Sequence, residues 1–69
     1  MASREVANRL ERLGFQRVSQ RGSHLKLRRK SGQLTHTVIV PMHSKDIVVS
    51  VLGRILQQAG LDWEEFDPI

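Results

Sequence analysis

Hydrophobic residues near the start of the chain recur at helical spacing. Four of them lie one, three and three positions apart, on one face of a helix: Val6, Ala7, Leu10 and Leu13. Ser3 is a residue type that caps helix N-termini. Gly14 follows the last apolar residue and suits a helix end, because glycine adopts positive φ at little cost. The pattern predicts a helix over about residues 3–13.

The middle of the chain changes to the period of a β-strand. In residues 24–30 (HLKLRRK), Leu25 and Leu27 alternate with polar residues, as in a strand with one buried face. The run before it, residues 15–20 (FQRVSQ), and the β-branched run after it, residues 35–41, predict two further strands.

Short turns join the three predicted strands. Arg21 and Gly22 form the first turn, and residues 31–33 (SGQ) form the second. Connections this short produce an antiparallel meander. Pro41 has no amide proton and therefore suits the end or the edge of a strand.

Helical spacing returns near the end of the chain, in VLGRILQQA. Its apolar positions are Val51, Leu52, Ile55, Leu56 and Ala59. Ser50 is the predicted cap of this helix, and Gly60 ends it. Asp62 is the predicted cap of a final turn, through which Trp63 or Phe66 packs back onto the domain.

The predicted fold class is α+β, with the order α-β-β-β-α in one domain over residues 1–69. A three-stranded antiparallel sheet has two faces, and two amphipathic helices can cover one of them. The residues expected to face the helices are Leu25, Leu27, Val38 and Val40. By alternation, His24, Lys26 and Arg28 then lie on the open face.

The charge of the chain is unevenly placed and suggests a partner. Among its 69 residues, all 11 Lys and Arg precede residue 61, whereas the last nine residues contain four acidic residues and no basic one. A basic body predicts a polyanion partner, most simply nucleic acid. Disulfides are excluded because there is no cysteine. No apolar run reaches the ~20 residues of a membrane helix, and no signal-peptide core is visible. We therefore expect a cytoplasmic protein without membrane contact.

His24 is the candidate for acid–base chemistry. It follows Gly22 and Ser23, where a turn lets a substrate backbone approach closely. Lys26 and Arg28 on the same face could hold phosphate oxygens. These cations also disfavour imidazolium and favour the neutral imidazole that a general base needs. A surface histidine without a task remains the alternative.

The remaining histidines and acids predict no metal site. Asp46 is the only acid between Glu11 and Asp62, which argues against a nuclease that needs several carboxylates around two metal ions. We expect no cofactor. His36 is predicted to face solvent from a strand. His43 follows the third strand and is the candidate for a second acid or base.

RNA contacts are predicted to be led by the backbone of the nucleic acid. There is no tyrosine, and Trp63 and the two phenylalanines are expected in the core, so aromatic base stacking is not available. The predicted RNA-binding residues are Arg21, Gly22, Ser23, Lys26, Arg28 and Lys45.

Four motifs in order give the chain a family resemblance. They are Leu13-Gly14-Phe15, Arg21-Gly22-Ser23-His24, Val40-Pro41-Met42-His43, and the helix from Leu52 to Leu61. Over about residues 3–66 the sequence resembles the HicA family of type II toxins, which are small mRNA interferases.

The resemblance implies a fold like that of double-stranded-RNA-binding domains and a catalytic role for His24. It also implies that the protein is an endoribonuclease that cleaves mRNA, and that a HicB-type antitoxin neutralises it. The scarcity of carboxylates predicts that this cleavage is metal-independent. We expect the free toxin to be monomeric. Two alternatives stay open: a non-catalytic RNA-binding module of the same fold, and a protein-interaction domain whose charge serves an acidic partner.

Overall fold

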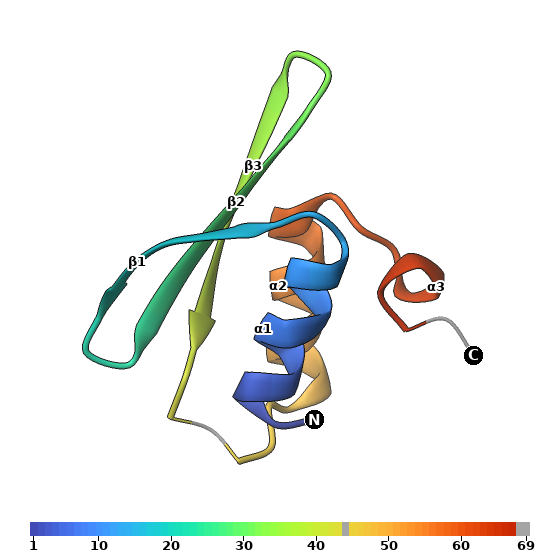
Figure 1. Cartoon of the computed structure of the whole chain (residues 1–69). Helices are drawn as coiled ribbons and strands as arrows, with labels where there is room; N and C mark the ends of the chain where they lie inside the picture. The colour runs from blue at the N-terminus through green and yellow to red at the C-terminus, as the bar shows by residue number, and fades with distance from the viewer. Residues whose placement is uncertain (44, 68–69) are drawn as a thin grey trace.

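The computed structural model describes residues 1–43 and 45–67 and confirms the predicted order of elements (Figure 1). The elements are α1 (Ser3–Arg12), β1 (Gln16–Arg21), β2 (His24–Ser31), β3 (Leu34–Pro41), α2 (Val49–Ala59) and the short α3 (Trp63–Phe66). None of the helices in these ranges has the length and apolar character of a membrane span.

The three strands form one antiparallel sheet in the order β1-β2-β3. β2 pairs with β3 along its whole length, from His24 opposite Pro41 to Ser31 opposite Leu34. β1 pairs only with the first part of β2, so the far end of the β2–β3 hairpin extends beyond the rest of the sheet (Figure 1). Pro41 ends an edge strand, as predicted.

Both long helices pack on one face of the sheet, and this prediction is confirmed (Figure 1). One apolar cluster joins residues of α1, α2 and the inward-facing positions of β2 and β3. The strand residues in it are those expected from alternation, Leu25, Leu27, Val38 and Val40, and all four are almost fully buried. Burying an aliphatic side chain of this size contributes roughly 1.5–3 kcal/mol, so this cluster fixes which face of β2 is inward.

Neither helix begins with the serine cap that the sequence predicts. The N-cap positions are Ala2 and Val48, and neither side chain caps its helix. Ser3 is instead the first residue of α1, where it is buried and donates a hydrogen bond from Oγ to the carbonyl of Pro41. Ser50 lies inside α2. The hydroxyl of Ser3 therefore joins α1 to the end of β3, opposite His24.

The C-terminal turn is capped as predicted, but only one of its aromatic residues is buried. Asp62 accepts from the backbone N–H of Glu65 at 2.7 Å, and the Glu65 carboxylate accepts from the Asp62 N–H at 3.2 Å. Phe66 is 2% exposed, whereas Trp63 is 48% exposed, so the expectation of Trp63 in the core is wrong. A helix of four residues presents one side chain to the core, and Phe66 takes that position.

Arg9 of α1 holds the C-terminal turn in place. Its guanidinium lies 5.8 Å from the centre of the Phe66 ring and pairs with Asp67 and Glu5. The hydrogen bond that Arg9 donates to Asp67, with a smaller contribution from Glu5, raises the pKa of Arg9 above its usual value. Arg9 is therefore charged at neutral pH, where both carboxylates are ionised.

His36 does not face solvent as predicted. It lies on the same side of β3 as Val38 and Val40 and is half-buried against the end of α2. A Cβ built on Gly60 would lie 2.6 Å from His36 Cε1, and Gly60 has a φ of 69°. Gly60 thus both ends α2 and leaves room for the imidazole.

Candidate active site

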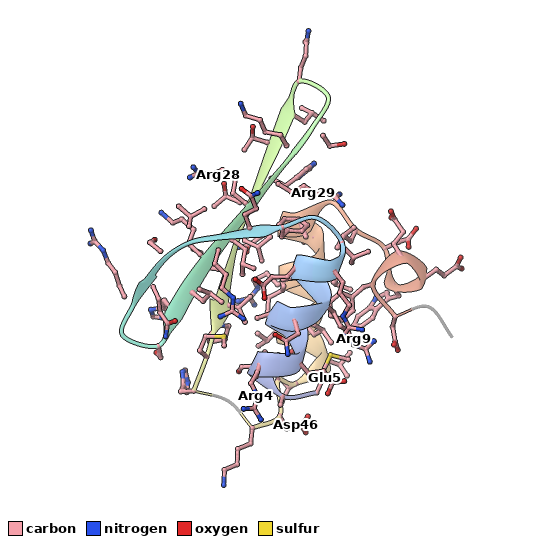
Figure 2. All side chains as sticks on the ribbon, in the orientation of Figure 1. Arg4, Glu5, Arg9, Arg28, Arg29 and Asp46 are labelled. Carbon is pink, nitrogen blue, oxygen red and sulfur yellow. The ribbon has the colours of Figure 1, made fainter. Side chains whose placement is uncertain are left out.

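The uncovered face of the sheet gathers basic side chains from two strands. The pairing register places Arg21 opposite His24 and Ser19 opposite Lys26. Arg28 continues the same face along β2, and Figure 2 shows it at the sheet, away from Arg4 on α1. No Asp or Glu occurs between Glu11 and Asp46, so the three strands contribute positive charge only. Such a surface attracts polyanions.

The turn before His24 requires a glycine for its backbone conformation. Gly22 has a φ of 57°, and no atom lies within 4 Å of the position where a Cβ would be. The carbonyl of Gly22 accepts from Gln20 Nε2 at 3.1 Å, and the carbonyl of Ser23 accepts from the Met42 N–H. These bonds fix the turn beside β3. The space next to Gly22 is open, at the place where the sequence suggested close approach of a substrate backbone.

His24 is exposed and lines a hollow on the open face. The other lining residues are Ser19, Arg21, Lys26 and Ile39. We call these five residues the cationic hollow. It brings one imidazole together with a guanidinium and an ammonium group, a combination that can hold a phosphate and exchange a proton with it.

A second hollow begins at His24 and extends over the edge of β3 to α2. It is lined by His24, Ile39, Pro41, Val51, Arg54, Ile55 and Gln58, and we call it the α2 hollow. Here the backbone N–H of Ile39 donates to Gln58 Oε1 at 3.4 Å, so α2 covers part of the free edge of β3. His24 and Ile39 belong to both hollows.

The contribution of α2 to this site was not predicted from the sequence. Arg54 and Gln58 are not among the predicted site residues. The signal was present in the spacing of Val51, Arg54 and Gln58, which are three and four positions apart and share one side of the helix. That spacing shows which residues share a side, but not that β3 and His24 lie beside it.

Five of the predicted site residues line neither hollow: Gly22, Ser23, Arg28, His43 and Lys45. The last two lie beyond the end of β3. Lys45 is exposed on the connection between β3 and α2, next to Asp46, which pairs with the amino group of Met1. His43 is exposed, two residues beyond Pro41, the partner of His24 in the sheet. The bond from the Met42 N–H to Ser23 holds the His43 segment near the turn that precedes His24.

Neighbouring basic residues on β2 lie on different sides of the hairpin, as Figure 2 shows for Arg28 and Arg29. Arg28 donates to Thr37 Oγ1 at 3.3 Å on the open face. Arg29, the next residue along β2, is half-buried on the helix side. Its guanidinium lies 4.9 Å from the Phe15 ring centre and donates to the Leu13 carbonyl at 2.9 Å. Arg29 therefore stabilises the end of α1 and is not available to a ligand.

Most acidic residues are engaged away from the two hollows. Glu11 pairs with Arg17 at 3.1 Å, Glu5 and Asp67 pair with Arg9, and Asp46 pairs with the N-terminus. Asp62 and Glu65 form the capping box of α3. Within residues 1–43 and 45–67, no three His, Asp or Glu side chains are grouped so that they could hold one metal ion.

The structure is a small α+β domain that places an exposed imidazole on a cationic sheet face. Comparison with known protein families assigns this domain to a family. Residues 3–61 match the family described as HicA toxin of bacterial toxin-antitoxin, and the chain belongs to this family. It is thus a toxin of a toxin–antitoxin pair. No curated protein matches the chain.

Proposed function

We propose that this toxin is a metal-independent endoribonuclease that cleaves mRNA in the cytoplasm, as one domain over residues 1–69. The observation that carries the proposal is the position of His24. It is exposed between two hollows, beside Arg21 and Lys26, on strands that contain no acid. A structural histidine has no need of such a position, whereas a general base must be reachable by a phosphate-bearing substrate.

The reaction that fits these groups is attack by a ribose 2′-OH on the adjacent phosphorus. His24 accepts the proton of the 2′-OH as the bond from O2′ to phosphorus forms. The bond from phosphorus to O5′ breaks, and O5′ takes up a proton. Arg21 and Lys26 stabilise the charge that accumulates on the phosphate oxygens in the transition state. The products are a 2′,3′-cyclic phosphate and a 5′-hydroxyl.

This chemistry needs no metal ion, and the acids that could hold one have other partners. Six of the seven acidic residues take part in ion pairs or the α3 capping box. A second group must donate the proton that O5′ takes up. His43 is the candidate for this acid, because the hydrogen bond from the Met42 N–H to the Ser23 carbonyl holds its segment close to His24.

RNA affinity should depend steeply on salt, because phosphate contacts from Arg21, Lys26 and Arg28 dominate binding. For single strands, each lost phosphate contact lowers the slope of log affinity against log salt by about 0.7. The double variant Lys26→Gln/Arg28→Gln should therefore lower the slope by about 1.4 in a fluorescence-anisotropy titration. The proposed site does not include Lys45, which lies off the sheet.

Arg4→Gln is the matched control for this titration. Arg4 is exposed on α1, away from Arg28 (Figure 2). Arg4→Gln removes one positive charge, half the loss in the double variant, from a site away from the open face, so it should leave the slope close to that of the wild type. If the double variant binds RNA as the wild type does at every salt concentration, the basic face is not the RNA site.

We also propose that the antitoxin is of the HicB type and covers His24. A surface composed of Arg21, Lys26 and Arg28 requires an acidic inhibitor surface, and complementary charge speeds association. Co-expression should restore growth, and the antitoxin should displace a fluorescent, non-cleavable RNA in a competition titration. Simultaneous binding of both, without mutual weakening, would show that inhibition acts from a distance.

A further inference from the structure

The α2 hollow has features that phosphate binding and proton transfer do not use. Ile39, Pro41, Val51 and Ile55 give it an apolar lining, and Ile39 is 37% exposed. A charged phosphate is not stabilised by contact with such a surface. The flat, apolar face of a nucleobase is stabilised, because the contact removes it from water. Besides His24, the polar side chains of Arg54 and Gln58 complete the lining. An apolar surface with a few placed polar groups is typical of a small-ligand site.

The hydrogen bond from the Ile39 N–H determines which atoms of Gln58 remain available to a ligand. A backbone N–H only donates, so the atom of Gln58 that faces Ile39 must be the carbonyl oxygen, at 3.4 Å. The Nε2 amide group therefore remains as a donor for a ligand. Arg54 also has only donors. The polar part of the hollow thus presents hydrogen-bond donors from two side chains of α2.

We propose that the α2 hollow binds the base of the nucleotide whose 2′-OH attacks, and that it selects guanine. This inference rests on the proposed function for the position of the sugar and phosphate. Because His24 belongs to both hollows, a nucleotide with its 3′-phosphate in the cationic hollow has its sugar at His24. Its base then reaches α2. Gln58 and Arg54 are the residues that determine specificity.

Guanine fits because its N7 and O6 are two adjacent acceptors. Adenine has an acceptor beside an amino donor at the same edge, and the amino group of cytosine is also a donor. Uracil places an N–H donor next to its carbonyl. At this edge only guanine offers two acceptors to the two donors, and arginine bound to guanine O6 and N7 is the commonest specific contact of this kind. Cytosine offers two adjacent acceptors, N3 and O2, at its Watson–Crick edge, but its single ring covers less of the apolar lining, so 3′-CMP is the competitor that should rank below 3′-GMP.

Binding of the four 3′-nucleoside monophosphates tests this inference without reference to cleavage. The probes are 3′-GMP, 3′-AMP, 3′-CMP and 3′-UMP, titrated while the Ile39 amide and the Gln58 side-chain amide are followed by NMR. The wild type should bind 3′-GMP most tightly and shift both signals. Gln58→Glu replaces the donor with an acceptor of the same shape, so the preference for 3′-GMP over 3′-AMP should fall roughly tenfold.

Gln57→Glu is the matched control. Gln57 is the neighbouring exposed residue of α2 and lines neither hollow, so this variant introduces the same charge without touching the proposed base site. It should weaken all four nucleotides equally and keep the preference for 3′-GMP. Equal affinity for the four nucleotides, or the same change of preference in both variants, would overturn the inference.

Mapping of cut sites in a mixed-sequence RNA separates this inference from the proposed function. Cleavage by the wild type after guanine, with a broadened pattern in Gln58→Glu, supports both. Cleavage with an unchanged pattern in Gln58→Glu overturns the base site and leaves the nuclease. Preferential 3′-GMP binding by a protein that cleaves no RNA would retain the base site and reject the nuclease.

Discussion

His24→Ala is expected to lower the rate of RNA cleavage about 10²–10⁴-fold, the usual contribution of a general base, while the protein remains folded. Alanine cannot accept the proton of the 2′-OH. The side chain is exposed and lies outside the buried apolar cluster, so its removal should leave the stability close to that of the wild type. Single-turnover cleavage of a labelled RNA measures the rate, and thermal unfolding followed by circular dichroism measures the fold.

His43→Ala provides the comparison within the same protein. It removes another exposed imidazole, one that lies outside both hollows, and should lower the rate less than His24→Ala does. An equally large loss would identify His43 as the acid that protonates O5′. Undiminished cleavage by folded His24→Ala would reject the catalytic assignment. If neither the wild type nor the variants cleave RNA that they bind, the chain is a non-catalytic RNA-binding module.

An RNA with one 2′-deoxy nucleotide, on the 5′ side of the cut, should resist cleavage at that position. The 2′-oxygen is the nucleophile of the proposed reaction, so its removal leaves nothing to form the bond to phosphorus. The same RNA should bind with nearly unchanged affinity, because the phosphates are intact. Cleavage of the unmodified RNA should persist in EDTA, with monovalent salt added to keep the ionic strength constant.

A 2′-deoxy nucleotide on the 3′ side of the cut is the control, and it should not prevent cleavage. Products that carry a 2′,3′-cyclic phosphate would agree with the proposed route and are identified by mass spectrometry. Cleavage of the RNA deoxygenated on the 5′ side would show that water is the nucleophile. Loss of activity in EDTA, with recovery on addition of magnesium, would show that a metal ion takes part.

Much of the fold follows from local patterns in the sequence. Spacing of three and four residues predicted α1 and α2, and alternation in β2 placed Leu25 and Leu27 inward. His24, Lys26 and Arg28 were therefore predicted on the uncovered face, as the pairing of β2 with β1 and β3 confirms. These predictions succeed because the periods of helix and strand are properties of the backbone itself.

Predictions that depend on contacts between distant residues were less successful. Ser3 was predicted to cap its own helix but bonds to Pro41, and His36 was predicted to face solvent but is half-buried beside Gly60. Trp63 was predicted in the core, but α3 buries Phe66 instead. In each case the residue type permits both positions, and the packing of another element selects one of them.

The sequence by itself determined the basic face, its lack of acids and the place of His24 after the Gly22 turn. Only the tertiary structure decided what surrounds His24. The pairing of β1 with β2 shifts between Arg17 and Ser19, which puts Arg17 opposite Leu27 and returns Ser19 and Arg21 to the open face. Strict alternation along β1 would have kept Arg17, Ser19 and Arg21 on one face of the sheet.

The docking of α2 along β3 likewise brought Gln58 to the Ile39 amide. Register and docking depend on contacts far apart in the chain, and no local period encodes them.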